Sequence, residues 1–76
     1  NYTMGNDVKI LSIEATNMGN DQQAIASEAQ RIIGNREFAT ANDFYDIEAD
    51  LINQACYNLG LQVPQGKLIP NWWTVD

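Results

Sequence analysis

The hydrophobic and polar positions follow a strand-like pattern first and a helical pattern afterwards. Residues 8–15 (VKILSIEA) are rich in strand-favouring residues, and the stretch TNMGND then interrupts them. Lys9 and Glu14, near the two ends of this segment, suit a strand that has one side exposed to water. We therefore predict a strand over residues 8–15, followed by a turn.

From residue 20 onward the apolar positions repeat with the period of an α-helix. Asn20 and Gln23 have the spacing of a capping box, and Asp21 suits the positively polarised N-terminus of a helix. Gly34 is a typical residue just beyond a helix C-terminus. The pattern predicts an amphipathic helix whose apolar stripe consists of Ile25, Ala29, Ile32 and Ile33.

After the connecting residues NREFA, a second helical pattern begins. Thr40 is the predicted N-cap, Asp43 occupies the third helical position, and Gly60 ends the run. One face of this segment is again apolar, formed by Phe44, Ile47, Leu51, Ala55 and Leu59. The segment is predicted to be a second amphipathic helix that buries this face.

The C-terminal residues 61–76 contain prolines and a central glycine. We expect one or two short strands there, around residues 67–69 and 72–75. The order strand, helix, helix, strand is typical of a two-layer α+β domain in which both helices pack on one face of a short sheet. Residues 1–76 are therefore expected to form a single globular domain, and a helical bundle with extended ends is the alternative.

The composition excludes several classes of partner. Ten acidic residues against four cations give a net charge of −6, and the cations are dispersed, at Lys9, Arg31, Arg36 and Lys67. Such dispersed cations do not form a groove that follows a phosphate backbone, so neither nucleic acid nor an anionic membrane is an expected partner. No apolar run reaches the length of a membrane span. A protein partner with a basic surface is the complementary expectation.

The residues that catalysis or a metal site needs are largely missing. There is no histidine and one cysteine, Cys56, which excludes His-based triads, Cys–His pairs and thiolate metal clusters. GLQVPQGK at residues 60–67 has the wrong glycine spacing for a phosphate-binding loop, and Leu68 replaces the hydroxyl residue that would hold Mg²⁺. We expect no enzyme activity, cofactor or metal, and a reduced, packed Cys56 in a cytoplasmic protein.

The acidic stretch DFYDIEAD at residues 43–50 contains one candidate surface. At about 100° per residue, three of its carboxylates fall within an arc of roughly 60° on the helix, opposite the apolar face. An amide and a phenol extend this arc towards the helix end. The predicted partner-binding ridge consists of Asp43, Asp46, Asp50, Asn53 and Tyr57. The alternative is an ordinary solvated helix face, whose first acids simply favour the helix dipole.

Glu48 is the acid that the helical wheel places towards the apolar face, between Phe44 and Leu51. A lone buried carboxylate is expensive, so Glu48 must reach a partner or extend to solvent. Arg36, which lies shortly before the helix, is the predicted partner. We expect an ion pair between these two side chains rather than a functional acid.

These observations favour a small acidic, non-enzymatic protein-binding module. In size and charge alone it is similar to small acidic phage and mobile-element proteins, such as anti-CRISPR proteins, which inhibit host enzymes that act on nucleic acid. The alternative is an assembly or oligomerisation protein, such as a homodimer, that uses its strand edges and tail. Trp72 and Trp73 would point to opposite faces of a tail strand, and we assign Trp73 to the partner-binding residues. A minimal enzyme is a third interpretation, which the absence of histidine disfavours.

Overall fold

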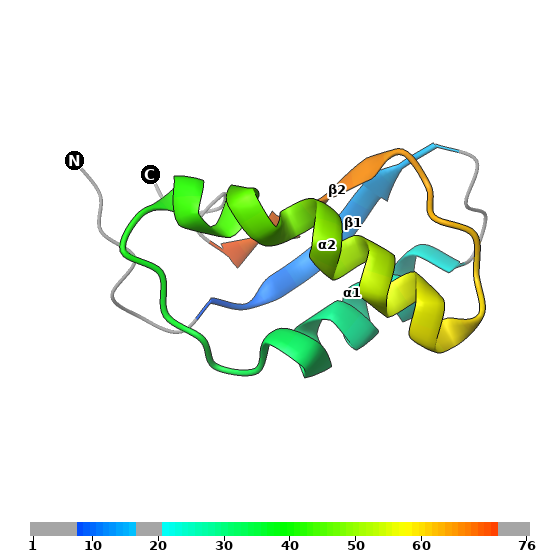
Figure 1. The fold of residues 1–76 in the computed structure, drawn as a ribbon, viewed down its shortest axis with the longest axis horizontal. Coiled ribbons are helices and arrows are strands. Elements are labelled where there is room, and N and C mark those ends of the chain that lie inside the picture. The colour runs from blue at the N-terminus through cyan, green and yellow to red at the C-terminus, as the bar shows by residue number, and fades with distance from the viewer. Residues whose placement is uncertain (1–7, 17–20, 72–76) are drawn as a thin grey trace.

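A computed structural model of the protein describes residues 8–16 and 21–71 and has the predicted α+β fold (Figure 1). Its elements follow one another as β1 (Ile10–Ala15), α1 (Asp21–Ile33), α2 (Ala41–Leu59) and β2 (Gly66–Pro70). The two strands form an antiparallel sheet, and both helices pack against it. The predicted β-α-α-β order and two-layer arrangement are thereby confirmed. The second tail strand, predicted at residues 72–75, lies outside the described residues.

β1 begins at Ile10, later than predicted, and a β-bulge shifts its pairing with β2 between Ile10 and Ser12. A bulge adds one unpaired residue to a strand, so it changes which residues face the partner strand. Before the bulge, Lys9 faces the chain beyond β2, since its carbonyl oxygen accepts a hydrogen bond from the Asn71 N–H at 2.7 Å. Leu11 is the extra residue, and its side chain is 46% exposed.

β2 begins at Gly66, where the two strands approach each other closely. Gly66 is paired with Ala15. A Cβ atom at position 66 would collide with the side chain of Ala15 and with the carbonyl oxygen of Glu14. Because part of this obstacle is backbone, it cannot move aside as the end of a flexible side chain could. The start of the ladder therefore requires glycine.

The helix ends follow the predicted local chemistry. The Thr40 hydroxyl accepts a hydrogen bond from the Asp43 N–H at 3.4 Å, and the Asp43 carboxylate accepts one from the Thr40 N–H at 3.3 Å. This reciprocal pair is a capping box at the N-terminus of α2. Gly34 and Gly60, directly after the two helices, have φ angles of 62° and 73°, the left-handed conformation that commonly ends a helix. The predicted cap of α1, Asn20, lies outside the described residues.

The core lies between the helices and the sheet and is centred on Phe44. The rings of Phe38 and Tyr45 meet the Phe44 ring edge-on, at centroid distances of 5.6 Å and 5.7 Å. Phe38 comes from the connection between the helices, which the sequence pattern did not assign to the core. Burying a side chain of this size contributes about 1.5–3 kcal/mol. The other buried apolar residues are Val8, Ile13, Ile25, Ala26, Ala29, Ile33, Leu51, Ile52, Ala55, Cys56, Leu68 and Pro70.

Candidate interaction surface

The outer side of α2 carries the residues predicted to form a ridge, Asp43, Asp46, Asp50, Asn53 and Tyr57, hereafter the α2 ridge. All five side chains are exposed, and Tyr57 is exposed to 85%. α2 contains no lysine or arginine. Apart from Asp43, the ridge side chains form no hydrogen bond or ion pair within residues 8–16 and 21–71. The α2 ridge is therefore a solvent-facing row of carboxylates that ends in an amide and a phenol.

Asp43 differs from the other two carboxylates of the α2 ridge because it also closes the capping box. Asp46 and Asp50 lie one helical turn apart and have no such role. Among the described residues, no group of three acidic or cysteine side chains converges closely enough to hold a metal ion. Asp46 and Asp50 are thus the acids of the ridge whose charge can be removed without disturbing the start of the helix.

The predicted ion pair between Glu48 and Arg36 is wrong. The Glu48 carboxylate accepts a hydrogen bond from the backbone N–H of Leu68 at 2.6 Å. Burial raises the pKa of the Glu48 carboxyl, and the Leu68 N–H and the charge of Lys67 act in the opposite direction. The guanidinium of Arg36 instead lies over the ring of Phe38, 5.1 Å from its centroid, in a cation–π contact. A backbone donor on β2 takes the place of the expected cation.

Two glutamines of α1 bind the backbone around β1, a role that the sequence did not reveal. The Gln30 carboxamide accepts from the Ile10 N–H and donates to the Val8 carbonyl oxygen. The Gln22 carboxamide donates to the Ala15 carbonyl oxygen at 3.0 Å. The spacing of Gln22 and Gln30 puts them on one side of α1. The sequence therefore shows that the two glutamines share one side of the helix. Only the structure shows that this side faces β1, where the glutamines can bind the backbone.

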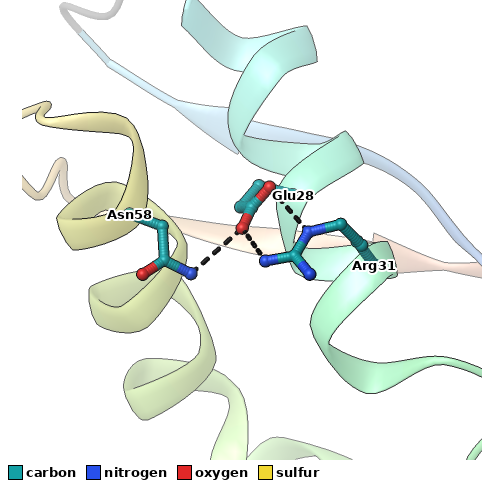
Figure 2. A network of polar contacts seen from close by, with 3 residues as sticks. All are labelled: Glu28, Arg31 and Asn58. Atoms are coloured by element: carbon teal, nitrogen blue, oxygen red, sulfur yellow. Dashed lines mark hydrogen bonds and ion pairs between the residues drawn. The ribbon is translucent and has the colours of Figure 1, made fainter.

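Glu28 joins the two helices, as Figure 2 shows. Its carboxylate accepts hydrogen bonds from Arg31 Nε at 3.1 Å and from Asn58 Nδ2 at 3.0 Å. The hydrogen bond from Arg31, and then that from Asn58, lowers the pKa of Glu28, and Glu28 in turn raises the pKa of Arg31. One of the four cations of the chain is thereby balanced by an acid of its own helix, α1.

Two of the surface hollows are lined by residues that the structure describes, and they differ in size. The larger, of about 470 Å³, lies between Asp21 and the connection formed by residues 62–65, and no member of the α2 ridge lines it. The smaller, of about 220 Å³, lies between α1 and α2, where Ile32 and Ile47 of the predicted apolar stripes are only half-buried. Asp50 borders this second hollow. The α2 ridge is therefore adjacent to a partly apolar depression.

Cys56 is fully buried, as predicted for a packed apolar side chain. Burial, together with the charge of Asp21, raises the pKa of its thiol. A raised pKa keeps the thiol protonated and unreactive at neutral pH. The remaining residue predicted to bind a partner, Trp73, lies outside the described residues, as does its neighbour Trp72.

Comparison with known proteins adds no relative. No protein-family model matches the chain, and no curated protein or solved structure matches it either. Within the described part of the chain, no helix is both long and apolar enough to cross a membrane. The class of the protein is therefore defined by its own fold and surface, as a small α+β domain with an acidic helix face.

Proposed function

We propose that this chain is a non-enzymatic protein-binding module that binds a basic surface of a partner protein through the α2 ridge. The observation that supports the proposal best is that one face of α2 combines exposed carboxylates and an exposed tyrosine, without a cation on the helix. Tyrosine is enriched among the residues that dominate interface energies, because its ring is large and its hydroxyl can pair. Tyr57 would be the anchor, and Asp46 and Asp50 would select the basic partner.

The partner is proposed to be a nucleic-acid-binding protein of the cytoplasm, which the module inhibits by occupying its basic surface. Successive acids of the α2 ridge are separated by about 4.5–6 Å along the helix axis, on the order of the spacing between neighbouring phosphates of a nucleic-acid strand. Close charge pairs across an interface can couple by several kcal/mol and raise the association rate. Because salt screens exposed charges, the affinity should fall as the ionic strength rises.

The test is capture of binding proteins from a lysate of the source cell, quantified by mass spectrometry. Immobilised wild type should retain a basic nucleic-acid-binding protein, and Asp46→Asn/Asp50→Asn should retain it at least about tenfold less, since two charge pairs are lost. Asp43 stays unchanged, so the capping box is intact. Tyr57→Ala should weaken retention as well. Nucleic acid added to the purified pair should displace the module.

The matched control is Glu14→Gln/Glu37→Gln, which removes two exposed acids elsewhere on the described surface. It changes the net charge by the same amount as the ridge variant and should bind like wild type. Equal loss in both variants would mean that net charge, rather than the α2 ridge, attracts the partner. Equal capture by all three proteins, or a partner that nucleic acid does not displace, would contradict the proposal.

A further inference from the structure

Within residues 8–16 and 21–71 the sheet has two strands, so each strand has an edge that no other described strand covers. Such edges can pair with another chain. The hydrogen bonds show which backbone groups lie on the free edge of β2. Asn71, directly after β2, donates its N–H to the Lys9 carbonyl oxygen, so position 71 faces the other strand. Because facing and outward positions alternate along an antiparallel strand, the outward positions of β2 are Gly66, Leu68 and Pro70.

The free edge of β2 offers few donors to an incoming strand. The Leu68 N–H is already bound by the Glu48 carboxylate at 2.6 Å. Pro70 has no N–H to offer. Among the outward positions of β2, this leaves the N–H of Gly66, which is exposed at the first position of the strand. An added strand would therefore find one donor where a regular edge of this length would present three.

The other edge of the sheet, along β1, is covered by α1. Gln22, at the start of α1, binds the carbonyl oxygen of Ala15 at the end of β1. Gln30, near the end of α1, binds the Ile10 N–H and the Val8 carbonyl oxygen at the start of β1. α1 thus runs back alongside β1 between these two contacts (Figure 1). At the two ends of β1, its carboxamides take the places that backbone groups of a third strand would take.

We infer that both edges of this sheet are closed against strand addition, and that Glu48 and Pro70 close the β2 edge against a second copy of this chain. The Glu48 carboxylate satisfies the Leu68 donor and places negative charge where the carbonyl oxygen of an added strand would lie. The inference concerns the sheet and not the α2 ridge, so it is independent of the proposed binding function. It argues against the strand edges as an assembly surface.

The test compares the mass and the amide exchange of variants as the protein concentration rises. The variant Glu48→Ala/Pro70→Val frees the backbone N–H of Leu68 and introduces a backbone N–H at position 70, where proline has none. The average mass of this variant, measured by light scattering, should rise from 8.5 kDa towards twice that value. Its Gly66 and Leu68 amides should become protected over the same concentrations. Glu48→Gln is the matched control, because its amide oxygen can still accept from Leu68, and it should behave like wild type.

Circular dichroism establishes that each variant is folded. A folded double variant with the mass of wild type would overturn the inference, as would association without protection of the Gly66 and Leu68 amides. Wild type provides a test that needs no variant. Its Leu68 amide points away from β1 and is held by Glu48 in a buried position, so it should exchange much more slowly than the exposed Gly66 amide. Equal exchange of these two amides would overturn the inference by itself.

Discussion

The two helices use their polar side chains in opposite ways. On α1, Gln22 and Gln30 bind the backbone around β1, and Glu28 connects α1 with α2. On the outer side of α2, Asp46 and Asp50 are exposed and make no polar contact with any described residue. These three polar residues of α1 therefore help to hold the fold together, whereas Asp46 and Asp50 of the α2 ridge face solvent.

This difference shows which polar residues are accounted for by their contribution to the stability of the fold. A hydrogen bond within the protein contributes about 0.5–1.5 kcal/mol to stability. Like charges one turn apart on a helix, as in the pair Asp46 and Asp50, cost a few tenths of a kcal/mol instead. Stability therefore accounts for Gln30 and for the cap residue Asp43, but not for the rest of the ridge. Solubility needs negative charge, yet it does not require the acids to share one helix face.

The largest loss of stability is expected from the glutamines of α1. Gln30→Ala should lower the free energy of unfolding by about 1–3 kcal/mol, because it leaves the Ile10 N–H and the Val8 carbonyl oxygen without their partner. Gln22→Ala removes one hydrogen bond and should cost about 1 kcal/mol. Urea denaturation measures both values. If neither variant lowered the free energy of unfolding, the polar residues of α1 would not differ from those of the α2 ridge in their contribution to stability.

Replacing Glu48 tests the one acid of α2 that reaches the sheet. Glu48→Ala should lower stability by about 1 kcal/mol, because the Leu68 N–H loses its acceptor. Glu48→Gln keeps an acceptor and removes the charge, so at neutral pH it should be as stable as wild type or more stable.

The raised pKa of Glu48 also predicts that the stability difference between Glu48→Gln and wild type depends on pH. The raised pKa means that the folded state holds a proton on Glu48 more readily than the unfolded state does. The stabilisation that this group contributes is therefore fully present below its ordinary pKa of 4.5 and is lost as the pH rises through the raised pKa. Denaturation series should show the advantage of Glu48→Gln over wild type growing from acid to neutral pH. Parallel pH curves would show that burial does not perturb Glu48.

Removing the ridge charges should change stability only slightly. Asp46→Asn/Asp50→Asn relieves the repulsion between the two carboxylates and should raise the free energy of unfolding by a few tenths of a kcal/mol. The same variant is expected to lose binding to the partner, so the loss of binding would not be caused by a loss of stability. A loss of more than about 1 kcal/mol, beyond the usual effect of a surface substitution, would mean that these acids hold the fold together as the glutamines of α1 do.

The smallest loss of stability is expected for Glu28→Gln. The pKa of Glu28 is lowered, chiefly by the hydrogen bond from Arg31. The stabilisation from Glu28 is therefore present above its ordinary pKa of 4.5 and lost as the pH falls through the lowered value. Glu28→Gln should lower the melting temperature slightly at neutral pH, and the difference should vanish in acid. A difference that persists in acid would assign the effect to packing rather than to charge.

Interactions between neighbours in the chain were predictable. The capping box joins Thr40 and Asp43, which are three positions apart, and Gly34 and Gly60 ended both helices where the pattern placed them. The exposure of the α2 ridge also followed from the sequence, because an apolar stripe on one side of a helix leaves the opposite side to solvent. What the α2 ridge binds stays a prediction.

The sequence by itself determined the order of the elements, the capping box of α2 and most of the face that each helix buries, because these depend on residues within one or two helical turns. The exception at the end of the predicted α2 face is Leu59, which is 38% exposed. The tertiary structure decided which polar groups meet. Glu48 bonds to Leu68 rather than Arg36, and Gln30 bonds to Ile10, in each case twenty positions away along the chain. A helical period gives the direction of a side chain but not the backbone group opposite it, since that depends on how the helices dock on the sheet.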